Sequence, residues 1–358
     1  MFQEIDVVLS FLWAFVMAVF AIPSIVYVAH LKNLLDEPDH RRMHQSLTPR
    51  LGGLAIFAGF ASAITIFGDV TGTIQRTLAS TLLLFFIGMK DDVVSISAFK
   101  KFFVQILATC IVMFLADVRI NNFHGFMGLT TIPDGVSYMF TFLVITGITN
   151  AINLIDGLDG LAGTLIVIIM GTFGCCFYIF GGDNFMAYAK MCFCLVGAVA
   201  GFLRYNFRHA IIFMGDTGSL VCGFLIAVTA IKFLDMQGQG LDNTPSLAIA
   251  VLVIPIFDTL RVFSLRILNG RSPFSPDKNH IHHVLLRFGQ SPLQVVLTLA
   301  FINISFIALT YLLKPLGDTA IIAGMGIIFT VVTLLIEWKH PANEVHRQLL
   351  AEEEMVNS

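Results

Sequence analysis

The sequence predicts an all-α polytopic membrane protein with about eleven transmembrane helices, its N-terminus outside and its C-terminus in the cytoplasm. Three observations support this fold class: the composition, a series of long apolar segments, and an uneven distribution of basic residues. Of the 358 residues, 56% are hydrophobic and 13% are charged, whereas a soluble globular protein carries about 25% charged residues. A mean hydropathy of +0.84 points the same way.

Apolar segments long enough to span a bilayer, or nearly so, recur along the chain. Each approaches the ~20 residues that a membrane-spanning helix requires, with the third and fourth short. The segments cover residues 7–29, 51–68, 76–90, 102–116, 136–151, 161–180, 188–203, 218–234, 246–264, 293–313 and 319–337. No internal repeat or soluble domain interrupts them. We therefore expect one integral-membrane domain over residues 1–337 and a short cytoplasmic tail over residues 338–358.

The basic residues set the orientation. With the N-terminus outside, sixteen Lys and Arg residues fall on one side of the membrane and five on the other. An excess of Lys and Arg marks the cytoplasmic side. The same side holds every dense polar cluster of the sequence, which predicts an active site in a cleft at the cytoplasmic face. All six cysteines lie inside apolar segments without metal-ligand spacing, so they are expected to be buried hydrophobic residues.

Two amides and two carboxylates lie between two apolar segments, at Asn150, Asn153, Asp156 and Asp159. Such a group is costly in hydrocarbon, so it should sit at a membrane face or in a wet cleft. A helical turn would place Asp156 and Asp159 on one face. The alternative is that they cap helices or form turns beside their glycines. The density of polar groups favours a functional site.

Two further acidic motifs lie on the same side. Asp91 and Asp92 close the third apolar segment, and adjacent carboxylates suit Mg²⁺ chelation. Their alternative is a solvated pair in a loop. Asp216 begins the eighth segment within Gly215-Asp216-Thr217-Gly218-Ser219, where backbone N–H groups could face an anion. Asp216 could otherwise be a helix N-cap, but capping does not account for the glycines on both sides.

Histidines and basic residues complete the cytoplasmic set. His280, His282 and His283 follow Arg271 in a spacing that matches no closed zinc site. Near Arg271 they resemble hydrogen-bond donors to phosphate, or else histidines of an interfacial loop. The first cytoplasmic loop, with Arg41, Arg42 and His44, would attract anionic headgroups.

Two smaller features have structural interpretations. Gly52 and Gly53 would permit close helix packing at the start of the second segment. Asp258 and Arg261, three residues apart, are interpreted as a local ion pair.

Carboxylate clusters, histidines and a basic loop on one face together predict metal-dependent phosphate chemistry. A secondary transporter of an anionic or sugar substrate is the competing class, since it also has many helices and buried carboxylates. Transporters, however, tend to bind substrate near the midplane, often within inverted repeats. A non-catalytic scaffold would leave the one-sided aspartates unexplained.

In combination, these motifs resemble the polyprenyl-phosphate N-acetylhexosamine-1-phosphate transferase family. The match runs from the Asp36-Glu37-Pro38 loop to His283 and keeps five motifs in family order. The run from His280 to Gly289, and Arg41-Arg42-x-His44, resemble the N-acetylglucosaminyl branch. The run Thr48-Pro49-Arg50-Leu51-Gly52-Gly53 departs from the pattern of the muramoyl-pentapeptide branch.

The resemblance implies roles for these residues. It assigns Asp91, Asp92 and Asp216 to Mg²⁺, for which Mn²⁺ could substitute. It places Asp156, Asp159 and Asn206 at the nucleotide site, where Phe213 would stack on uracil. It places the histidines near the sugar diphosphate. The expected catalytic residues are Asp91, Asp92, Asp156, Asp159, His282 and His283. The remaining expected substrate-binding residues are Asn150, Asn153, Arg271, His280, Arg41, Arg42 and His44.

The implied reaction is attack by undecaprenyl phosphate on the β-phosphorus of a UDP-N-acetylhexosamine, most simply UDP-GlcNAc. It releases UMP and forms a lipid-linked sugar diphosphate that initiates a cell-envelope glycan. A phosphate monoester has a second pKa of about 6, so the acceptor is largely dianionic at neutral pH. We therefore expect Asp91 to orient it or to bind metal at least as much as to take its proton. The expected location is the bacterial inner membrane among its lipids. We expect no nucleic-acid partner, and the helical surface would accommodate a homodimer.

Overall fold

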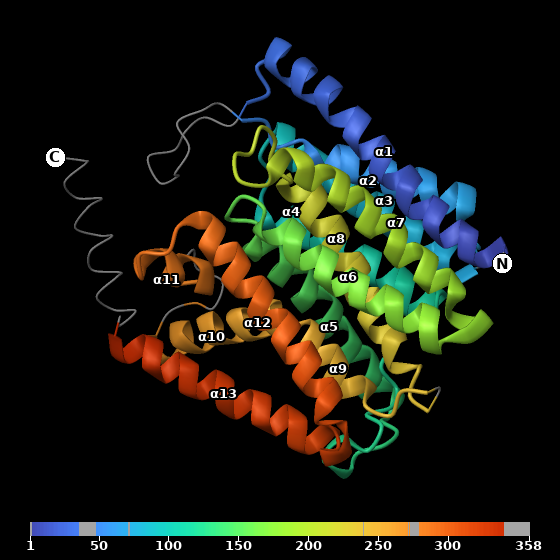
Figure 1. Ribbon diagram of the computed structural model, residues 1–358, viewed down its shortest axis with the longest axis vertical. Coiled ribbons are helices and arrows are strands. Elements are labelled where there is room, and N and C mark those ends of the chain that lie inside the picture. The colour runs from blue at the N-terminus through green and yellow to red at the C-terminus, as the bar shows by residue number, and fades with distance from the viewer. Residues whose placement is uncertain are drawn as a thin grey trace.

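The computed structural model describes residues 2–35, 48–70, 72–238, 240–270, 272 and 279–339, which form helices joined by turns (Figure 1). The helices are α1 (Phe2–Leu31), α2 (Gly52–Phe67), α3 (Gly72–Val93), α4 (Ala98–Cys110), α5 (Asp134–Ile155), α6 (Leu161–Phe180), α7 (Gly182–Asn206), α8 (Gly215–Leu234), α9 (Thr244–Val251), α10 (Val253–Leu268), α11 (Ile281–Arg287), α12 (Pro292–Leu312) and α13 (Asp318–Lys339). Three short elements accompany them: η1 (Ile111–Leu115), η2 (Phe126–Gly128) and η3 (Lys314–Leu316).

The described residues form an all-α fold that is consistent with a polytopic membrane protein. Within the described residues, nine helices are long and apolar enough to cross a membrane, and ten if the bent pair α9 and α10 is one span. With α2, an apolar helix of 16 residues, these helices coincide in position with the predicted segments. The number of spans that cross the bilayer and their orientation stay predictions.

The expected lengths were wrong for two segments. The third segment forms the 22-residue helix α3, because polar residues extend the helix beyond the apolar stretch at both ends. The fourth continues from α4 through the π-helical element η1, and together they span 18 residues from Ala98 to Leu115. The short apolar helix is α2.

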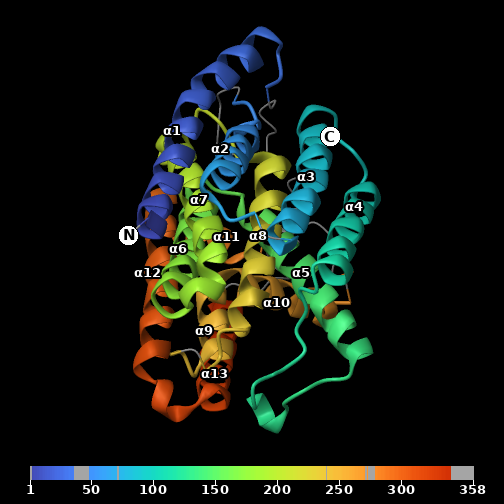
Figure 2. The same cartoon turned by 90° about the vertical axis from the view of Figure 1, so that its right-hand side faces the viewer.

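Helix α8 is the centre of the bundle. Every residue from Thr217 to Ile231 is buried, as expected for a helix that is apolar on all sides. Helices α3, α4 and α5 lie on one side of α8, and α1, α6 and α7 lie on the other (Figure 2). At the edge of the bundle, α13 exposes Ile327, Val331, Leu334 and Trp338. An exposed apolar surface of this kind suits contact with lipid.

The segment predicted as one span over residues 246–264 is broken. Helices α9 and α10 meet at Leu252 with a bend of 72°. Pro255 has no N–H, so it cannot donate to the carbonyl of Val251 four residues earlier. Asn303 of α12, which is fully buried, donates from Nδ2 to the carbonyls of Ala250 and Val251, at 3.1 Å each. The bend sends α10 toward α11 and its histidines.

Candidate active site

Seven helix ends gather at one end of the bundle, because the helices run alternately up and down. The starts of α2, α4, α6 and α8 meet the ends of α3, α5 and α7 there. Close packing makes this possible: a Cβ on Gly88 would lie 2.5 Å from Cα of Thr217, and a Cβ on Gly218 would lie 3.0 Å from Cα of Gly53. The predicted packing role of the Gly52-Gly53 pair is therefore confirmed: a Cβ on Gly52 would lie 2.5 Å from the Phe202 ring of α7, and one on Gly53 would come still closer to N of Gly218.

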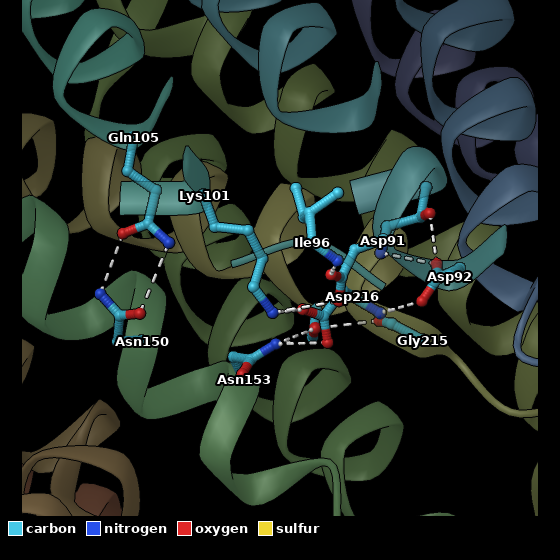
Figure 3. Close-up of polar contacts among 11 residues, drawn as sticks. Asp91, Asp92, Ile96, Lys101, Gln105, Asn150, Asn153, Gly215 and Asp216 are labelled. Carbon is cyan, nitrogen blue, oxygen red and sulfur yellow. Dashed lines mark hydrogen bonds and ion pairs between the residues drawn. The ribbon is translucent and has the colours of Figure 1, made fainter. Parts of the chain in front are cut away.

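Lys101 of α4 bridges two of the predicted metal-binding carboxylates. Its Nζ lies 3.0 Å from Oδ2 of Asp91, at the end of α3, and 2.7 Å from Oδ2 of Asp216, at the start of α8 (Figure 3). Asp91 also accepts a hydrogen bond from the backbone N–H of Ile96 at 2.8 Å. All three charged side chains are partly exposed, at 16–26%. Two carboxylates thus converge on one cationic group.

Asp92 has a different position from Asp91. Its Oδ1 accepts the backbone N–H of Asp216 at 2.8 Å, and its Oδ2 accepts the backbone N–H of Thr217 at 2.9 Å and the Thr217 hydroxyl. These are free N–H groups of the first turn of α8, so Asp92 caps that helix from α3. Gly215 allows the approach: its φ is +72°, and a Cβ there would lie 2.7 Å from both Asp92 oxygens. Asp216, considered as an N-cap from sequence, instead faces Lys101.

Two amides of α5 connect the cluster to its neighbours. Asn153 donates from Nδ2 to the Ser219 hydroxyl at 2.8 Å and approaches Oδ1 of Asp216 at 3.3 Å. One turn earlier, Asn150 forms a reciprocal amide pair with the buried Gln105 of α4, at 3.0 and 3.4 Å (Figure 3). This pair holds α4 against α5 one turn from Lys101 and from Asn153.

The segment from Asp156 to Gly160 is a turn between α5 and α6, not a helical turn. Burial raises the pKa of the Asp156 carboxyl well above its usual range, and the charges of Asp216, Asp92 and Asp159 raise it further. Asp156 is therefore electrostatically part of the same cluster.

The chain between α7 and α8 completes this side of the site. Asp159 accepts the backbone N–H of Ala210 at 3.2 Å. Asn206 accepts the N–H of Gly160 at 2.8 Å and donates to the carbonyl of Ile212 at 2.9 Å. The backbone of the half-buried Phe213 pairs with Pro49 and Gly52, at 2.8 Å in each case. The residues predicted to form the nucleotide site thus lie on adjoining segments.

The predicted histidines lie on and beside the short helix α11. Nδ1 of His280 lies 2.8 Å from Oδ2 of Asp258, and Oδ1 of Asp258 accepts the backbone N–H of Ile281 at 2.7 Å. Arg261 donates to the carbonyl of Asn279 at 2.6 Å. Asp258 and Arg261, expected to pair locally, therefore both bind the segment that begins α11, so the direction of α10 sets the position of the histidines.

His282 faces the acidic turn. A Cβ at Gly157 would lie 2.9 Å from Nε2 of His282, so the ring would have to shift if this residue had a side chain. The ring is buried, and neither of its nitrogens has a hydrogen-bond partner within the described part of the chain. Burial, with a smaller contribution from the His283 ring 4.2 Å away, lowers the pKa of His282 to about 3. His282 is thus a neutral imidazole with unused hydrogen-bonding capacity.

The carboxylate oxygens of this site are suitable ligands for a hard divalent cation, but they supply only part of its coordination sphere. Asp91 and Asp216 present carboxylate oxygens to one point, where the Lys101 ammonium stands in for a cation. Among the described residues, no three acidic, histidine or cysteine side chains form a larger ligand set. Mg²⁺ commonly takes one or two carboxylates, with water and substrate phosphates as its other ligands. Asp91 and Asp216 therefore suit Mg²⁺, whereas both Asp92 oxygens already bind α8.

Sequence reasoning did not single out Lys101 or Gln105 as site residues. Lys101 appeared only as one of many basic residues on the cytoplasmic side. Gln105 is a buried amide in an apolar helix, one turn after Lys101. This spacing was the one feature of the sequence that could have indicated that the two residues share a face of the helix. Four predicted residues, Arg41, Arg42, His44 and Arg271, lie outside the described residues.

Comparison with known proteins identifies the class of this chain. Residues 74–234 match the family model described as "Glycosyl transferase family 4". The chain is 33% identical over 335 residues to a probable undecaprenyl-phosphate N-acetylglucosaminyl 1-phosphate transferase of Bacillus subtilis, covering 93% of this chain and 91% of the relative. It is 31% identical to an undecaprenyl-phosphate alpha-N-acetylglucosaminyl 1-phosphate transferase of Yersinia pestis, covering 85% and 79%.

A third relative, a decaprenyl-phosphate N-acetylglucosaminephosphotransferase of Mycolicibacterium smegmatis, is 33% identical and covers 84% of this chain and 80% of its own length. The fold and these matches define a membrane-embedded sugar-phosphate transferase. The chain belongs to the polyprenyl-phosphate N-acetylhexosamine-1-phosphate transferases of glycosyl transferase family 4, which confirms the resemblance drawn from its motifs.

Proposed function

We propose that this protein transfers GlcNAc 1-phosphate from UDP-GlcNAc to undecaprenyl phosphate at the cytoplasmic face of the bacterial inner membrane, releasing UMP. The product would begin a cell-envelope glycan, such as lipopolysaccharide O-antigen or teichoic acid. The names of the relatives support this lipid acceptor and this sugar. The single observation that carries the proposal is the convergence of Asp91 and Asp216 on one cationic point.

Phosphoryl transfer depends mainly on positioning and on neutralising charge. Asp91 and Asp216 would hold Mg²⁺, which when bound supplies positive charge to the diphosphate. Asp92 fixes the start of α8, and with it Asp216, relative to α3. Asn153 orients the Asp216 carboxylate through Oδ1. The acceptor phosphate needs no general base at neutral pH, so Asp91 acts by position.

The remaining residues would bind the donor. Asp159, Asn206 and Phe213 lie on the two segments proposed to hold the nucleotide. His282 would donate a hydrogen bond to a phosphate or sugar oxygen as a neutral imidazole, because its buried ring nitrogens have partners to gain. Asp258 keeps His280 and the first turn of α11 in place. Substrate binding thus draws on both sides of the acidic cluster.

The test is a reconstitution of the reaction with purified protein. UMP release is followed with undecaprenyl phosphate, MgCl₂ and a panel of UDP-N-acetylhexosamines, and the lipid product is identified by mass. We expect UMP only when carrier lipid, metal and one UDP-sugar are all present. Folded, lipid-supplied protein that releases no UMP with any UDP-sugar would contradict the proposal. UMP release with a sugar other than GlcNAc would correct the donor alone.

A further inference from the structure

We propose that Lys101 occupies the position of the divalent cation between Asp91 and Asp216, and that metal binding moves its ammonium group onto the substrate phosphates. This inference rests on the proposed function, because it concerns how the same site loads its metal. Lys101 would bind the two carboxylates first and the substrate phosphates afterwards. Metal binding and capture of the phosphates would then be one coupled event.

The geometry makes Lys101 a competitor of the metal. Its Nζ lies within 3.0 Å of one oxygen from each carboxylate, and a divalent ion held by both carboxylates would have to use the same oxygens. Two cations cannot share these positions, because like charges a few ångströms apart repel strongly in a partly buried site. Binding of one therefore requires the departure of the other.

The exchange is favourable in charge and feasible in structure. A divalent ion attracts the two carboxylates about twice as strongly as an ammonium at the same distance. Lysine carries its charge on a flexible four-carbon stem. The Lys101 side chain is 26% exposed, so it can move without opening the core, and exposed ion pairs of this kind are individually weak.

The surroundings explain why a substitute cation is needed before the metal binds. Asp92 and Asp159 add negative charge beside Asp91 and Asp216, and these charges contribute to the raised pKa of the buried Asp156. Carboxylates that share a site repel one another unless a cation lies between them. Lys101 would keep the metal-free cluster together and would then remain beside the diphosphate as a second positive charge.

The alternative is that Lys101 is a permanent strut that preorganises both carboxylates for the metal. The two interpretations predict opposite changes in metal affinity when the charge is removed. Lys101→Met should bind the metal more tightly if Lys101 competes, and more weakly if Lys101 is a strut. Lys100→Met is the matched control, because it removes the same charge from the adjacent, exposed position.

The experiment is an Mn²⁺ titration of the purified protein in detergent, with free Mn²⁺ followed by electron paramagnetic resonance and Mg²⁺ as competitor. We expect Lys101→Met to bind roughly three- to thirtyfold more tightly than the wild type, from the loss of two partly exposed ion pairs. We expect Lys100→Met and Lys101→Arg to bind as the wild type does. A thermal melt of each variant, with and without Mn²⁺, verifies folding.

Unchanged or weaker binding in Lys101→Met would overturn the exchange while leaving the proposed function intact. If no variant and no wild-type protein bound Mn²⁺, both the exchange and the metal dependence of the proposed function would fail. A second measurement tests the phosphate contact. Lys101→Met should show a raised KM for the UDP-sugar despite its tighter metal binding, and an unchanged KM would contradict the transfer of the ammonium to phosphate.

Discussion

Two lysines of this protein each bridge two aspartates, and they lie at opposite ends of the bundle. Lys101 joins Asp91 and Asp216 near the start of α2, whereas Lys190 of α7 joins Asp6 and Asp69 near its end. Because α2 has 16 residues, the two clusters are separated by about 24 Å along its axis. Their contacts are alike, but their exposure to solvent differs.

At the far end the cation is buried and its partners face outward. Lys190 is 2% exposed, and Asp6 and Asp69 are 39% and 57% exposed. At the site, the ammonium and both carboxylates share intermediate exposure. If the carboxylates moved away, the buried Lys190 ammonium would remain unpaired and away from water, which is costly, so this cluster fixes α1, α7 and the connection after α2. A half-exposed cation between converging carboxylates can be replaced. Exposure, more than contact distance, separates the two roles.

The largest expected effect comes from a substitution that disrupts the site around Lys101. Gly215→Ala should lower UMP release roughly a hundredfold, because a misplaced reacting group costs about that much, and a Cβ there displaces Asp92 from α8. The measurement is the rate per folded protein. Gly238→Ala is the control: Gly238 also has a positive φ, of +84°, but a Cβ there meets open space. Equal losses in the two variants would assign the effect to backbone strain alone.

The second prediction breaks the far cluster. Asp6→Asn with Asp69→Asn leaves the Lys190 charge buried without a charged partner, and we expect a loss of about 2 kcal/mol, below the usual cost because the amide oxygens still accept hydrogen bonds. Thermal unfolding in detergent measures it. Adding Lys190→Met should restore most of the loss, and Mn²⁺ affinity should not change. If the double variant unfolded at the same temperature as the wild type, a structural role for Lys190 would be contradicted.

The third prediction concerns the amide pair behind Lys101. Asn150→Leu should lower stability by about 1 kcal/mol, because the buried Gln105 is left unpaired. Gln105→Leu should lower it by less, because the half-buried Asn150 keeps its hydrogen bond to the Thr146 carbonyl. The double variant should lose less than the sum of the single losses. A double-mutant cycle on the melting temperature measures this coupling, and strict additivity would show that the two amides act independently.

The fourth prediction concerns the pH dependence of stability. His282 has its pKa lowered to about 3 in the folded protein, against about 6.5 unfolded. Its contribution is therefore complete above about pH 6.5 and is lost as the pH falls toward 3, because the unfolded chain gains the proton first. Melting temperatures from pH 7 to pH 4 should fall by a few degrees, and less in His282→Asn. If the melting temperature fell with pH equally steeply in the wild type and in His282→Asn, His282 would not be the cause of the fall.

Much of the fold could be predicted from sequence because spans depend on long apolar stretches. The break between α9 and α10 was missed because a proline inside an apolar segment does not always break the helix, as Pro23 within α1 shows. The bend also needs a donor to the freed carbonyl, and Asn303 on α12 supplies it. The full length of α3 was missed for a different reason. Its ends are polar, so no apolar pattern in the sequence marks them as helical.

The aspartates of the candidate site could be predicted from the sequence, whereas Lys101 could not. Asp91, Asp156 and Asp216 stand out in an apolar chain because a carboxylate there is costly. Lys101 does not stand out, since basic residues are abundant on the cytoplasmic side for reasons of orientation. The division of labour between Asp91 and Asp92 was equally hidden, because adjacent residues point in different directions only once α3 and α8 are placed together.

The most direct test compares one carboxylate from each lysine-bridged pair. UMP release is measured for Asp216→Asn and Asp69→Asn, each with undecaprenyl phosphate, UDP-GlcNAc and a range of MgCl₂ concentrations. The account predicts that Asp216→Asn loses nearly all activity and that Asp69→Asn keeps the wild-type rate per folded protein. Wild-type activity in Asp216→Asn, or equal losses in the two variants, would contradict the assignment of the reaction to the Lys101 end of the bundle.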